Sequence, residues 1–375
     1  MIYLDYSANT PVDTRVLEQF CAVERRCIGN ANSHHQAGSA AKAEIDAATI
    51  KIASLLGVQP AEIIYTSGAS EANNFALKGL ARLSRHAGRH IISTSLEHSS
   101  VSGTLTALQE QGYEIDLLDV KQDGTVDLEH LKDLLRPDTI CVAVTLVDSE
   151  LGVVQPVQEI AAILKAYPHC HLHVDATQAV GKIPVSFEGV DTMSLTAHKF
   201  YGLNGIGLLI KRRNLALEPL IHGGESTTIY RSGTPTVALA SSLACALDFA
   251  VTDLPGRVDH VAKLNAELRA ALSTYPLVRI NSPDHAIPHV LNLSVQNVKG
   301  TVFQRELDAK GVCVSVKSAC SSDGLPSRAV FAVSRDRRNA LSSWRISLSH
   351  LTTEDEIKAF LQAFDVCYRE LTAVH

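Results

Sequence analysis

The strongest constraint on the fold of this chain is a regular alternation of short apolar runs with helical patterns. Seven runs rich in β-branched residues predict strands at residues 62–65, 90–94, 115–118, 140–146, 171–175, 192–195 and 206–210. Helical patterns fall between several of them, at residues 70–83, 100–111, 128–135 and 157–166. Strands that alternate with helices build a mostly parallel sheet that is covered by helices on both faces. The sequence therefore predicts an α/β fold with a seven-stranded, mostly parallel sheet.

A second, smaller unit is predicted after the alanine-rich helical stretch at 236–252. The pair Pro255-Gly256 follows it and is typical of a domain junction. The remaining pattern alternates helices at 257–272, 302–310 and 353–371 with strand-like pieces at 279–280 and 290–295. Thr353 and Glu356 have the spacing of a capping box before the last helix. We expect a large domain at residues 13–253 and a small α+β domain made of residues 1–12 and 254–375.

Composition excludes several classes of protein. The chain has 375 residues, of which 46% are hydrophobic and 20% charged, as in soluble globular proteins rather than disordered or fibrous ones. A net charge of −6 argues against a general nucleic-acid or anionic-membrane surface. The first residues lack the basic and apolar regions of a secretory signal. The longest apolar stretch, residues 237–247, is too short to span a bilayer. We expect a cytoplasmic protein with no nucleic-acid or membrane partner.

The cysteines indicate one exceptional position. None of the eight forms a Cys-x-x-Cys pair, so neither a zinc ribbon nor a thioredoxin-type centre is indicated, and we expect mostly free thiols. Seven lie in or beside apolar patterns and are predicted to be in the core. Cys320 instead lies in a polar Ser/Asp/Gly-rich loop beside Lys317, which favours an accessible thiolate.

Three segments combine a strand end with polar residues. Residues 65–73 read Tyr-Thr-Ser-Gly-Ala-Ser-Glu-Ala-Asn, a strand, a glycine turn and a helix opened by Ser70; this favours a phosphate site, or simply a capped turn. Asp175 ends a predicted strand and could hold a cofactor ring nitrogen protonated or cap a helix. Lys199 follows the strand at 192–195, where a lysine suits a Schiff base to an aldehyde cofactor, although an ordinary loop lysine has the same pattern.

Two further patterns keep alternatives open. Arg345 lies in a strand-like segment of the small domain and can bind a carboxylate through two hydrogen bonds, or lie on the surface. His171, His173 and Asp175 share one face of a strand, as metal ligands do, but nothing in their pattern defines a metal.

In this order, the motifs resemble the cysteine desulfurases of the NifS/IscS group, within the class V aminotransferases of fold type I pyridoxal-phosphate enzymes. The resemblance covers nearly the whole chain. It rests on these segments: Tyr3-Leu4-Asp5, residues 29–35, 66–71, Glu97-His98, residues 150–152, 173–178, His198-Lys199, residues 231–234, 318–320 and 345–348. The resemblance implies pyridoxal 5′-phosphate as the cofactor, a homodimer, L-cysteine as substrate and a sulfur-acceptor or scaffold protein as partner.

The resemblance also implies roles for individual residues. Lys199, Cys320 and His98 are the implied catalytic residues: Lys199 as the Schiff-base lysine and proton shuttle, Cys320 as the nucleophile on a mobile loop, and His98 as the imidazole stacked on the ring. The implied cofactor contacts are Ala69, Ser70, His98, Ser149, Asp175, Gln178, Thr196, His198, Lys199 and Thr234, of which Thr234 reaches across the dimer interface. The implied substrate contacts are Arg345, which clamps the carboxylate, together with Ser149 and Asn9. No resident metal is implied, although Cys320 is a candidate transient iron–sulfur ligand.

The implied activity removes sulfur from L-cysteine, leaving L-alanine and a persulfide on Cys320, for iron–sulfur cluster assembly or thio-modification of tRNA or DNA. Selenocysteine lysis, β-elimination, transamination, and a sulfur-carrier or adaptor role are the alternatives. The adaptor alternative is motivated by a departure from the family pattern, because Asp148-Ser149 stands where the family has two asparagines. Lys317 also replaces a glycine. We expect the Cys320 loop to be poorly ordered or to lie away from the cofactor.

Overall fold

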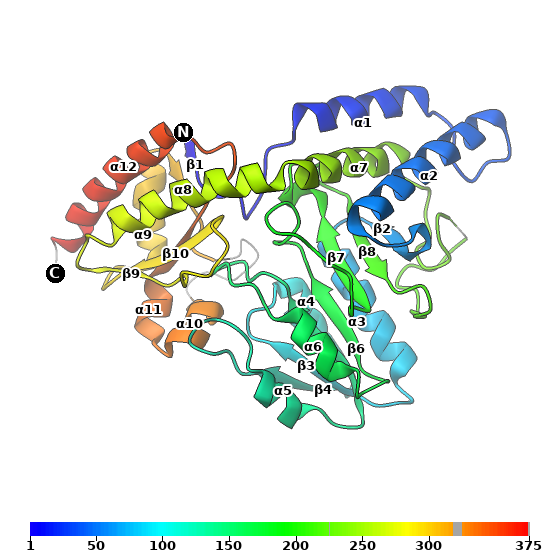
Figure 1. Cartoon of the computed structure of the whole chain (residues 1–375), viewed down its shortest axis with the longest axis horizontal. Helices are drawn as coiled ribbons and strands as arrows, with labels where there is room; N and C mark the ends of the chain where they lie inside the picture. Colours follow the sequence, from blue (N-terminus) through cyan, green and yellow to red (C-terminus); the bar gives the residue numbers. More distant parts are fainter. Residues whose placement is uncertain (225, 318–324, 374–375) are drawn as a thin grey trace.

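A computed structural model describes residues 1–224, 226–317 and 325–373 of the chain. A seven-stranded sheet forms its centre, with the strand order β2-β8-β7-β6-β5-β3-β4 (Figure 1). Its strands are β2 (Ile63–Thr66), β3 (His90–Thr94), β4 (Glu114–Leu118), β5 (Thr139–Thr145), β6 (His171–Asp175), β7 (Thr192–Thr196) and β8 (Gly207–Lys211). β8 runs antiparallel to both of its neighbours, and the other neighbouring strands are parallel. The predicted mostly parallel sheet is thereby confirmed.

Helices cover both faces of this sheet because its strands are apolar on both sides. Ile91 and Leu209 face a core formed with α3 (Ala69–Ser84) and α4 (Ser99–Gln109). Their neighbours Ile92 and Leu208 face the opposite core. That second face is covered by these helices: α1 (Thr14–Arg26), α2 (Gln36–Leu56), α6 (Val157–Leu164) and α7 (Val237–Thr252). α5 (Leu128–Leu134) packs at the β4 edge.

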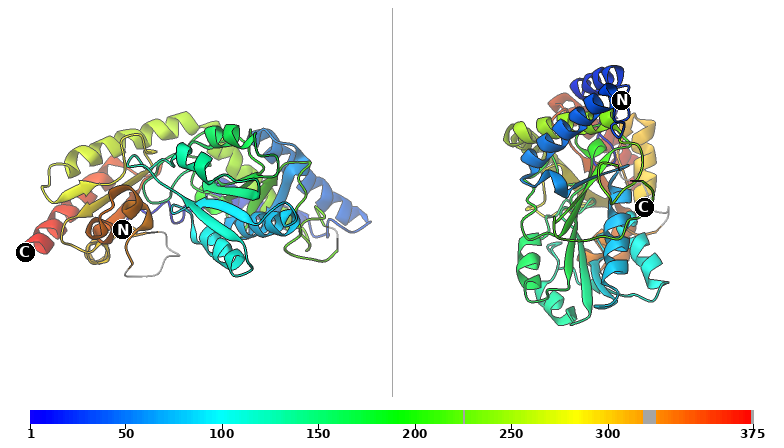
Figure 2. Two further views of the ribbon diagram at one scale, coloured as in Figure 1. Left: turned by 90° about the horizontal axis from the view of Figure 1, so that it is seen from below. Right: turned by 90° about the vertical axis from the view of Figure 1, so that its right-hand side faces the viewer.

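A separate core lies at one end of the elongated molecule (Figure 2). A three-stranded antiparallel sheet supports it, formed by β9 (Val278–Ile280), β10 (Val290–Val295) and β12 (Ser343–Ser347). The helices around it are α8 (Leu254–Leu272), α9 (Gly300–Ala309) and α12 (Glu354–Thr372). Trp344 and Phe303 stack at its centre, with ring centroids 5.1 Å apart. This is the expected smaller α+β unit, while the exact boundaries at residues 12 and 253 stay a prediction.

The amino-terminal residues belong to this second core. β1 (Ile2–Tyr3) pairs in parallel with β11 (Val312–Cys313), and Leu4 is fully buried there. Two short helices, α10 (Arg328–Ser334) and α11 (Arg337–Ser342), complete this part. Three-residue 3₁₀ turns precede β2 (Pro60–Glu62) and follow β7 (Ala197–Lys199).

Helix α8 begins earlier than its sequence pattern predicts. Pro255 lies in the first turn of α8, which starts at Leu254 instead of residue 257. A proline is tolerated there because the first turn of a helix has no acceptor for its N–H group. The Pro-Gly pair therefore begins a helix rather than forming a loop. In the described ranges no single helix is long and apolar enough to cross a membrane; α7 and α8 meet that test only as a pair bent by 65°.

The expected burial of the cysteines is partly wrong. Cys141, Cys170 and Cys367 are buried. Cys21, Cys27, Cys245 and Cys313 are only partly buried, and of these Cys27 and Cys245 pack at the margin of the large core, where one side of the residue meets solvent. All seven are free thiols. Cys320 lies outside the described residues, as does the expectation about the conformation of its loop.

Candidate active site

A cavity of about 340 Å³ opens at the carboxyl ends of β6 and β7, where parallel sheets place their ligands. Most of the predicted site residues line it. From the sequence prediction, these are Ala69, Ser70, His98, Ser149, Asp175, Gln178, Thr196, His198, Lys199 and Arg345. Asn9 lies beside the cavity in an exposed position, and its side chain donates to the Thr10 carbonyl. Thr234 lines a neighbouring cavity instead, with Thr66 and Arg231.

One end of the cavity is built to receive an anion. Helix α3 begins there, and its N-cap Gly68 supplies no side-chain hydrogen bond to the first amide groups. The first-turn N–H groups of a helix attract negative charge when no cap satisfies them. Thr196 and His198 line the same cavity, with Thr196 next to Gly68 and its Oγ1 3.1 Å from His198 Nδ1. Burial lowers the pKa of His198 to about 4, so this imidazole is neutral at pH 7.

A buried carboxylate occupies the end of β6. Asp175 Oδ1 accepts from the Thr177 amide at 2.9 Å, and its Oδ2 accepts from Asn73 Nδ2 at 2.8 Å. The Asn73 carbonyl oxygen in turn accepts from Ser194 Oγ and lies 3.0 Å from His173 Nε2. These two donors fix the orientation of the Asp175 carboxyl group, which lines the cavity. Sequence reasoning missed Asn73, since only the packing of α3 on the sheet brings it there.

The hydrogen bonds around His173 indicate a structural role for this residue rather than metal binding. His173 Nδ1 lies 2.9 Å from Thr192 Oγ1, so both ring nitrogens have partners within the sheet and α3. Burial lowers the pKa of His173. His171 faces Asp191 instead, at 3.7 Å. Across the described part of the chain, no group of three or more His, Cys, Asp or Glu side chains could hold a metal ion.

His98 caps helix α4 at another wall of the cavity. Its Nδ1 accepts from the Ser100 amide at 3.1 Å. Because a backbone N–H must donate to this atom, the neutral ring carries its proton on Nε2. Burial lowers the pKa of His98, which favours this neutral form. The ring can therefore stack on a planar group and donate or relay a proton from Nε2.

The amide of Gln178 is oriented by two neighbours that leave no ambiguity. Lys182 Nζ donates to Gln178 Oε1 at 2.7 Å, and Gln178 Nε2 donates to the Ser7 carbonyl at 2.9 Å. The Ser7 carbonyl can only accept, so the group facing it must be the Gln178 N–H and the amide cannot be flipped. Gln178 lines the cavity and has one N–H left to donate. Lys182 is buried, and burial lowers its pKa to about 7.

The amino-terminal segment closes the cavity over Lys199. Lys199 Nζ donates to the carbonyl oxygens of Ser7 at 2.8 Å and Ala8 at 2.5 Å. Thr10 Oγ1 donates to the His198 carbonyl at 2.9 Å, which fixes the chain next to the lysine. Residues 7–10 therefore help to hold the lysine, although the sequence motifs assigned no such role to their backbone.

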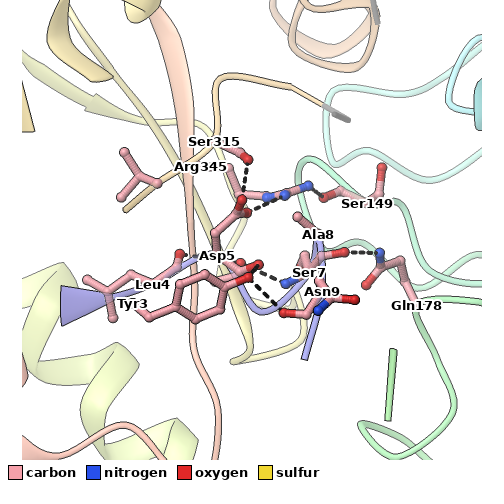
Figure 3. Close-up of polar contacts among 12 residues, drawn as sticks. Tyr3, Leu4, Asp5, Ser7, Ala8, Asn9, Ser149, Gln178, Ser315 and Arg345 are labelled. Carbon is pink, nitrogen blue, oxygen red and sulfur yellow. Dashed lines mark hydrogen bonds and ion pairs between the residues drawn. The ribbon is translucent and has the colours of Figure 1, made fainter. Parts of the chain in front are cut away.

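Arg345 approaches from β12 of the second core, so both parts of the molecule contribute to one site. Its side chain is almost completely buried and lines the cavity. Arg345 Nη1 donates to the backbone carbonyl of Ser149 at 2.7 Å (Figure 3). Position 149 thus contacts the guanidinium through its main chain, a contact that does not depend on which side chain stands there. Burial raises the pKa of the neighbouring Asp148 to about 7.

Comparisons with known proteins agree with this geometry. The model of the family "Aminotransferase class-V" matches residues 2–360. The "Cysteine desulfurase IscS" of Proteus mirabilis is 40% identical over 365 residues, covering 95% of this chain and 90% of that protein. A solved "NIFS-like protein" superposes with a TM-score of 0.92 at 35% identity, covering 99% of both chains. A structure titled "SspA in complex with cysteine" superposes with a TM-score of 0.83 at 30% identity, covering 94% of this chain and all of that one.

The chain therefore belongs to the class-V aminotransferase family, with the fold type I architecture of pyridoxal-phosphate enzymes. Within that family its place is in the NifS/IscS group, and it is a cysteine desulfurase. Enzymes of this family generally depend on pyridoxal 5′-phosphate.

Proposed function

We propose that this cysteine desulfurase transfers the sulfur of L-cysteine to Cys320, releases L-alanine, and passes the sulfur to an acceptor protein. The observation that carries the proposal is the presence of Lys199 and Arg345 in one cavity, each supplied by a different core. An amine-handling lysine and a carboxylate-binding arginine suit an α-amino acid. The similar SspA structure is titled as a complex with cysteine, which supports the same substrate class.

We propose that pyridoxal 5′-phosphate binds in this cavity, and the residues fit it. The uncapped start of α3, with Ala69, Ser70, Thr196 and His198, suits the phosphate. Asp175 suits the pyridine nitrogen, and the free N–H of Gln178 suits the ring hydroxyl oxygen. The remaining contacts proposed are His98, Ser149 and Lys199. When bound, the cofactor supplies an electron sink for the substrate carbon that loses its proton.

The chain's own residues would then bind and orient the substrate. Arg345 would hold the α-carboxylate through N–H groups that its present partners leave available. Lys199 would move the α-proton, since its amine is held at the cavity by backbone carbonyls. His98 presents a neutral ring with the proton on Nε2. Asn9 and the Ser149 side chain remain proposed substrate contacts.

The sulfur step itself is a balanced group transfer. The Cys320 thiolate attacks the substrate sulfur, so that the carbon–sulfur bond breaks while a sulfur–sulfur bond forms. The substrate carbon takes up a proton and leaves as L-alanine, and the sulfane sulfur stays on Cys320. An acceptor thiolate then takes the terminal sulfur for iron–sulfur cluster assembly or for thio-modification of tRNA or DNA. Because Cys320 lies outside the described residues, its role rests on the family resemblance.

The test is the release of sulfide and L-alanine from L-cysteine in the presence of a reducing thiol. The wild type should produce equal amounts of both, and Cys320→Ala should produce neither. Cys21→Ala, which removes a partly buried thiol on α1, is the matched control and should retain activity. Sulfide release that survives Cys320→Ala would refute the persulfide route.

A further inference from the structure

The guanidinium of Arg345 is held on two sides by groups of the protein itself. Nη1 donates to the Ser149 carbonyl, and Nη2 donates to Asp5 Oδ1 at 2.9 Å (Figure 3). Nε is buried, and no hydrogen-bond partner for it lies among the described residues. A guanidinium has five N–H donors, so these two hydrogen bonds leave donors for a further acceptor. Arg345 is therefore aimed before any substrate binds.

Asp5 is itself fixed by two segments that are distant in the sequence, the one around Ser315 and strand β12. Its Oδ2 accepts from Ser315 Oγ at 2.7 Å, while its Oδ1 accepts from Arg345. Its backbone forms a parallel bridge with Ser347 of β12. Ser315 in turn forms an antiparallel bridge with Arg345. Because both carboxylate oxygens and the backbone are engaged, Asp5 holds Nη2 in one place rather than following it.

A buried guanidinium requires such a partner. Arg345 is 1% exposed, and an unpaired cation in that position would be costly. Asp5 does not line the cavity, so it does not meet a ligand there directly. Its influence on a ligand passes through Arg345. Ordinary surface ion pairs contribute little, but this pair orients a group that lines the site.

We propose that Asp5 is the positioning residue of the carboxylate clamp: it holds Arg345 through Nη2 so that the remaining N–H groups receive the substrate carboxylate. This inference rests on the proposed function, because it assumes an amino-acid substrate. It adds the residue that sets the selectivity of the site for an α-carboxylate. The conservative change Asp5→Asn keeps an acceptor for Nη2 and can donate to Ser315, whereas Asp5→Ala removes both contacts.

The test measures binding to the holoenzyme rather than turnover. S-methyl-L-cysteine keeps the amine and carboxylate but lacks a free thiol, and its methyl ester also lacks the carboxylate charge. The dissociation constant of each is measured by titration calorimetry. The ratio of the ester constant to the acid constant reports recognition of the carboxylate. In Asp5→Ala we expect this ratio to fall about tenfold, the loss of one charge-assisted contact, because the acid binds more weakly while the ester is nearly unaffected.

Three further variants make the outcome specific. Asp5→Asn should keep a ratio close to that of the wild type, and Ser315→Ala should lower it moderately. Glu218→Gln removes the partner of Arg82 in an exposed ion pair of 3.2 Å and should leave the ratio unchanged. If Asp5→Ala does not fold, Asp5→Ser carries the same expectation, since a serine hydroxyl is too short to reach Nη2.

An unchanged ratio in Asp5→Ala overturns the proposal, and so does an Asp5→Asn variant that loses as much as Asp5→Ala. A wild type that binds the acid but makes no L-alanine from L-cysteine refutes the proposed function instead. That result leaves the role of Asp5 in carboxylate binding open to the same measurement. A purely structural role of Asp5 would lower stability without changing the ratio.

Discussion

At the scale of single residues, the site depends on buried polar groups whose partners come from other elements. Asn73 on α3 connects the Asp175 carboxylate of β6 with Ser194 of β7 and His173. A buried amide that satisfies several partners at once fixes their orientation, and its loss would remove one hydrogen bond from each of them. Lys182 plays the corresponding part for Gln178. These two residues hold the groups that face the cavity.

Lys182 should make the stability of the protein depend on pH. Burial lowers its pKa from 10.5 to about 7, so between these values the unfolded chain binds one proton more than the folded chain. The free energy of unfolding therefore rises with pH in that window, by up to about 1.4 kcal/mol per pH unit. Below pH 7 both states are protonated and this slope disappears.

Lys182→Met should remove that slope. Denaturant unfolding of the wild type and the variant between pH 7.5 and 9.5 measures the effect. Lys263→Met, which changes an exposed lysine on α8, is the control and should follow the wild type. Parallel stability curves for wild type and Lys182→Met would contradict the assignment of the titrating group.

At the scale of elements, the turn before α3 requires that β8 pass very close to it. A Cβ atom on Gly207 would lie 2.6 Å from the Leu195 carbonyl and 2.7 Å from Gly68 Cα. Gly68 is the N-cap at the anion-binding end of the cavity, and Gly207 pairs with Thr196. The absence of a side chain at position 207 therefore allows the sheet and the turn to meet.

Gly207→Ala should lower the free energy of unfolding by about 1–3 kcal/mol, the usual cost of overpacking. It should also weaken cofactor binding, because the added methyl group displaces Gly68 at the proposed phosphate end of the cavity. Thermal unfolding and titration of the apoprotein with pyridoxal 5′-phosphate measure the two effects. Gly103→Ala on α4 is the control, because a Cβ there meets nothing within 4 Å. Unaltered cofactor affinity in Gly207→Ala would show that the turn tolerates the shift.

The start of helix α12 has a capping box that the sequence predicts. Thr353 Oγ1 accepts from the Glu356 amide at 3.2 Å, and Glu356 Oε2 accepts from the Thr353 amide at 2.9 Å, so the predicted capping box is confirmed. Thr353→Ala should destabilise the protein by about 1 kcal/mol, and Thr353→Ser should restore most of the loss. The midpoint of chemical unfolding reports both. Equal midpoints for the Ala and Ser variants would mean that the cap contributes nothing.

How far the sequence predicts an element depends on how it encodes its buried face. The strands of the large sheet were predictable because β-branched and apolar residues mark them. α2 has no comparable apolar pattern, since its buried positions include Gly38, Ala41 and Ala48, and these small residues occur in helices, strands and loops alike. α10 and α11, of seven and six residues, are too short for a periodic pattern.

The same distinction holds for the candidate site. Asp175 and Lys199 were predictable as strand-end residues, because the carboxyl edge of a parallel sheet is where ligands bind. The part of Asp5 in holding Arg345 was not, since 340 positions separate the two in the sequence. Lys182 and Asn73 were likewise hidden, because their roles exist only once three elements have packed.

At the scale of the whole molecule, the position of Thr234 bears on whether two copies of the chain assemble into a dimer. Thr234 lines a cavity next to the proposed phosphate end but does not line the proposed cofactor cavity of its own chain. The family resemblance implies that it serves the site of a second copy. The site would then be complete only in a homodimer.

Complementation between two inactive variants tests this. If Thr234 acts across the interface, a mixture of Thr234→Ala and Lys199→Ala subunits contains hybrid dimers with one wholly native site. After random exchange, about a quarter of the wild-type number of sites should be native, and activity should recover accordingly. Each variant alone, refolded in the same way, is the control. A mixture no more active than its components would place Thr234 in the site of its own chain.

The position of the amino-terminal segment has a consequence for biosynthesis. Ile2 pairs with Val312, so a ribosome that exposes the first residues must add about 310 more before their partner strand exists. Closing a loop of about 310 residues is slow, because contacts between residues far apart in the sequence raise the contact order of the fold. Lys199 is held by carbonyls of that same segment. A nascent chain can therefore fold its large sheet early, yet its reactive lysine acquires its native surroundings only after residues 312–313 have been synthesised.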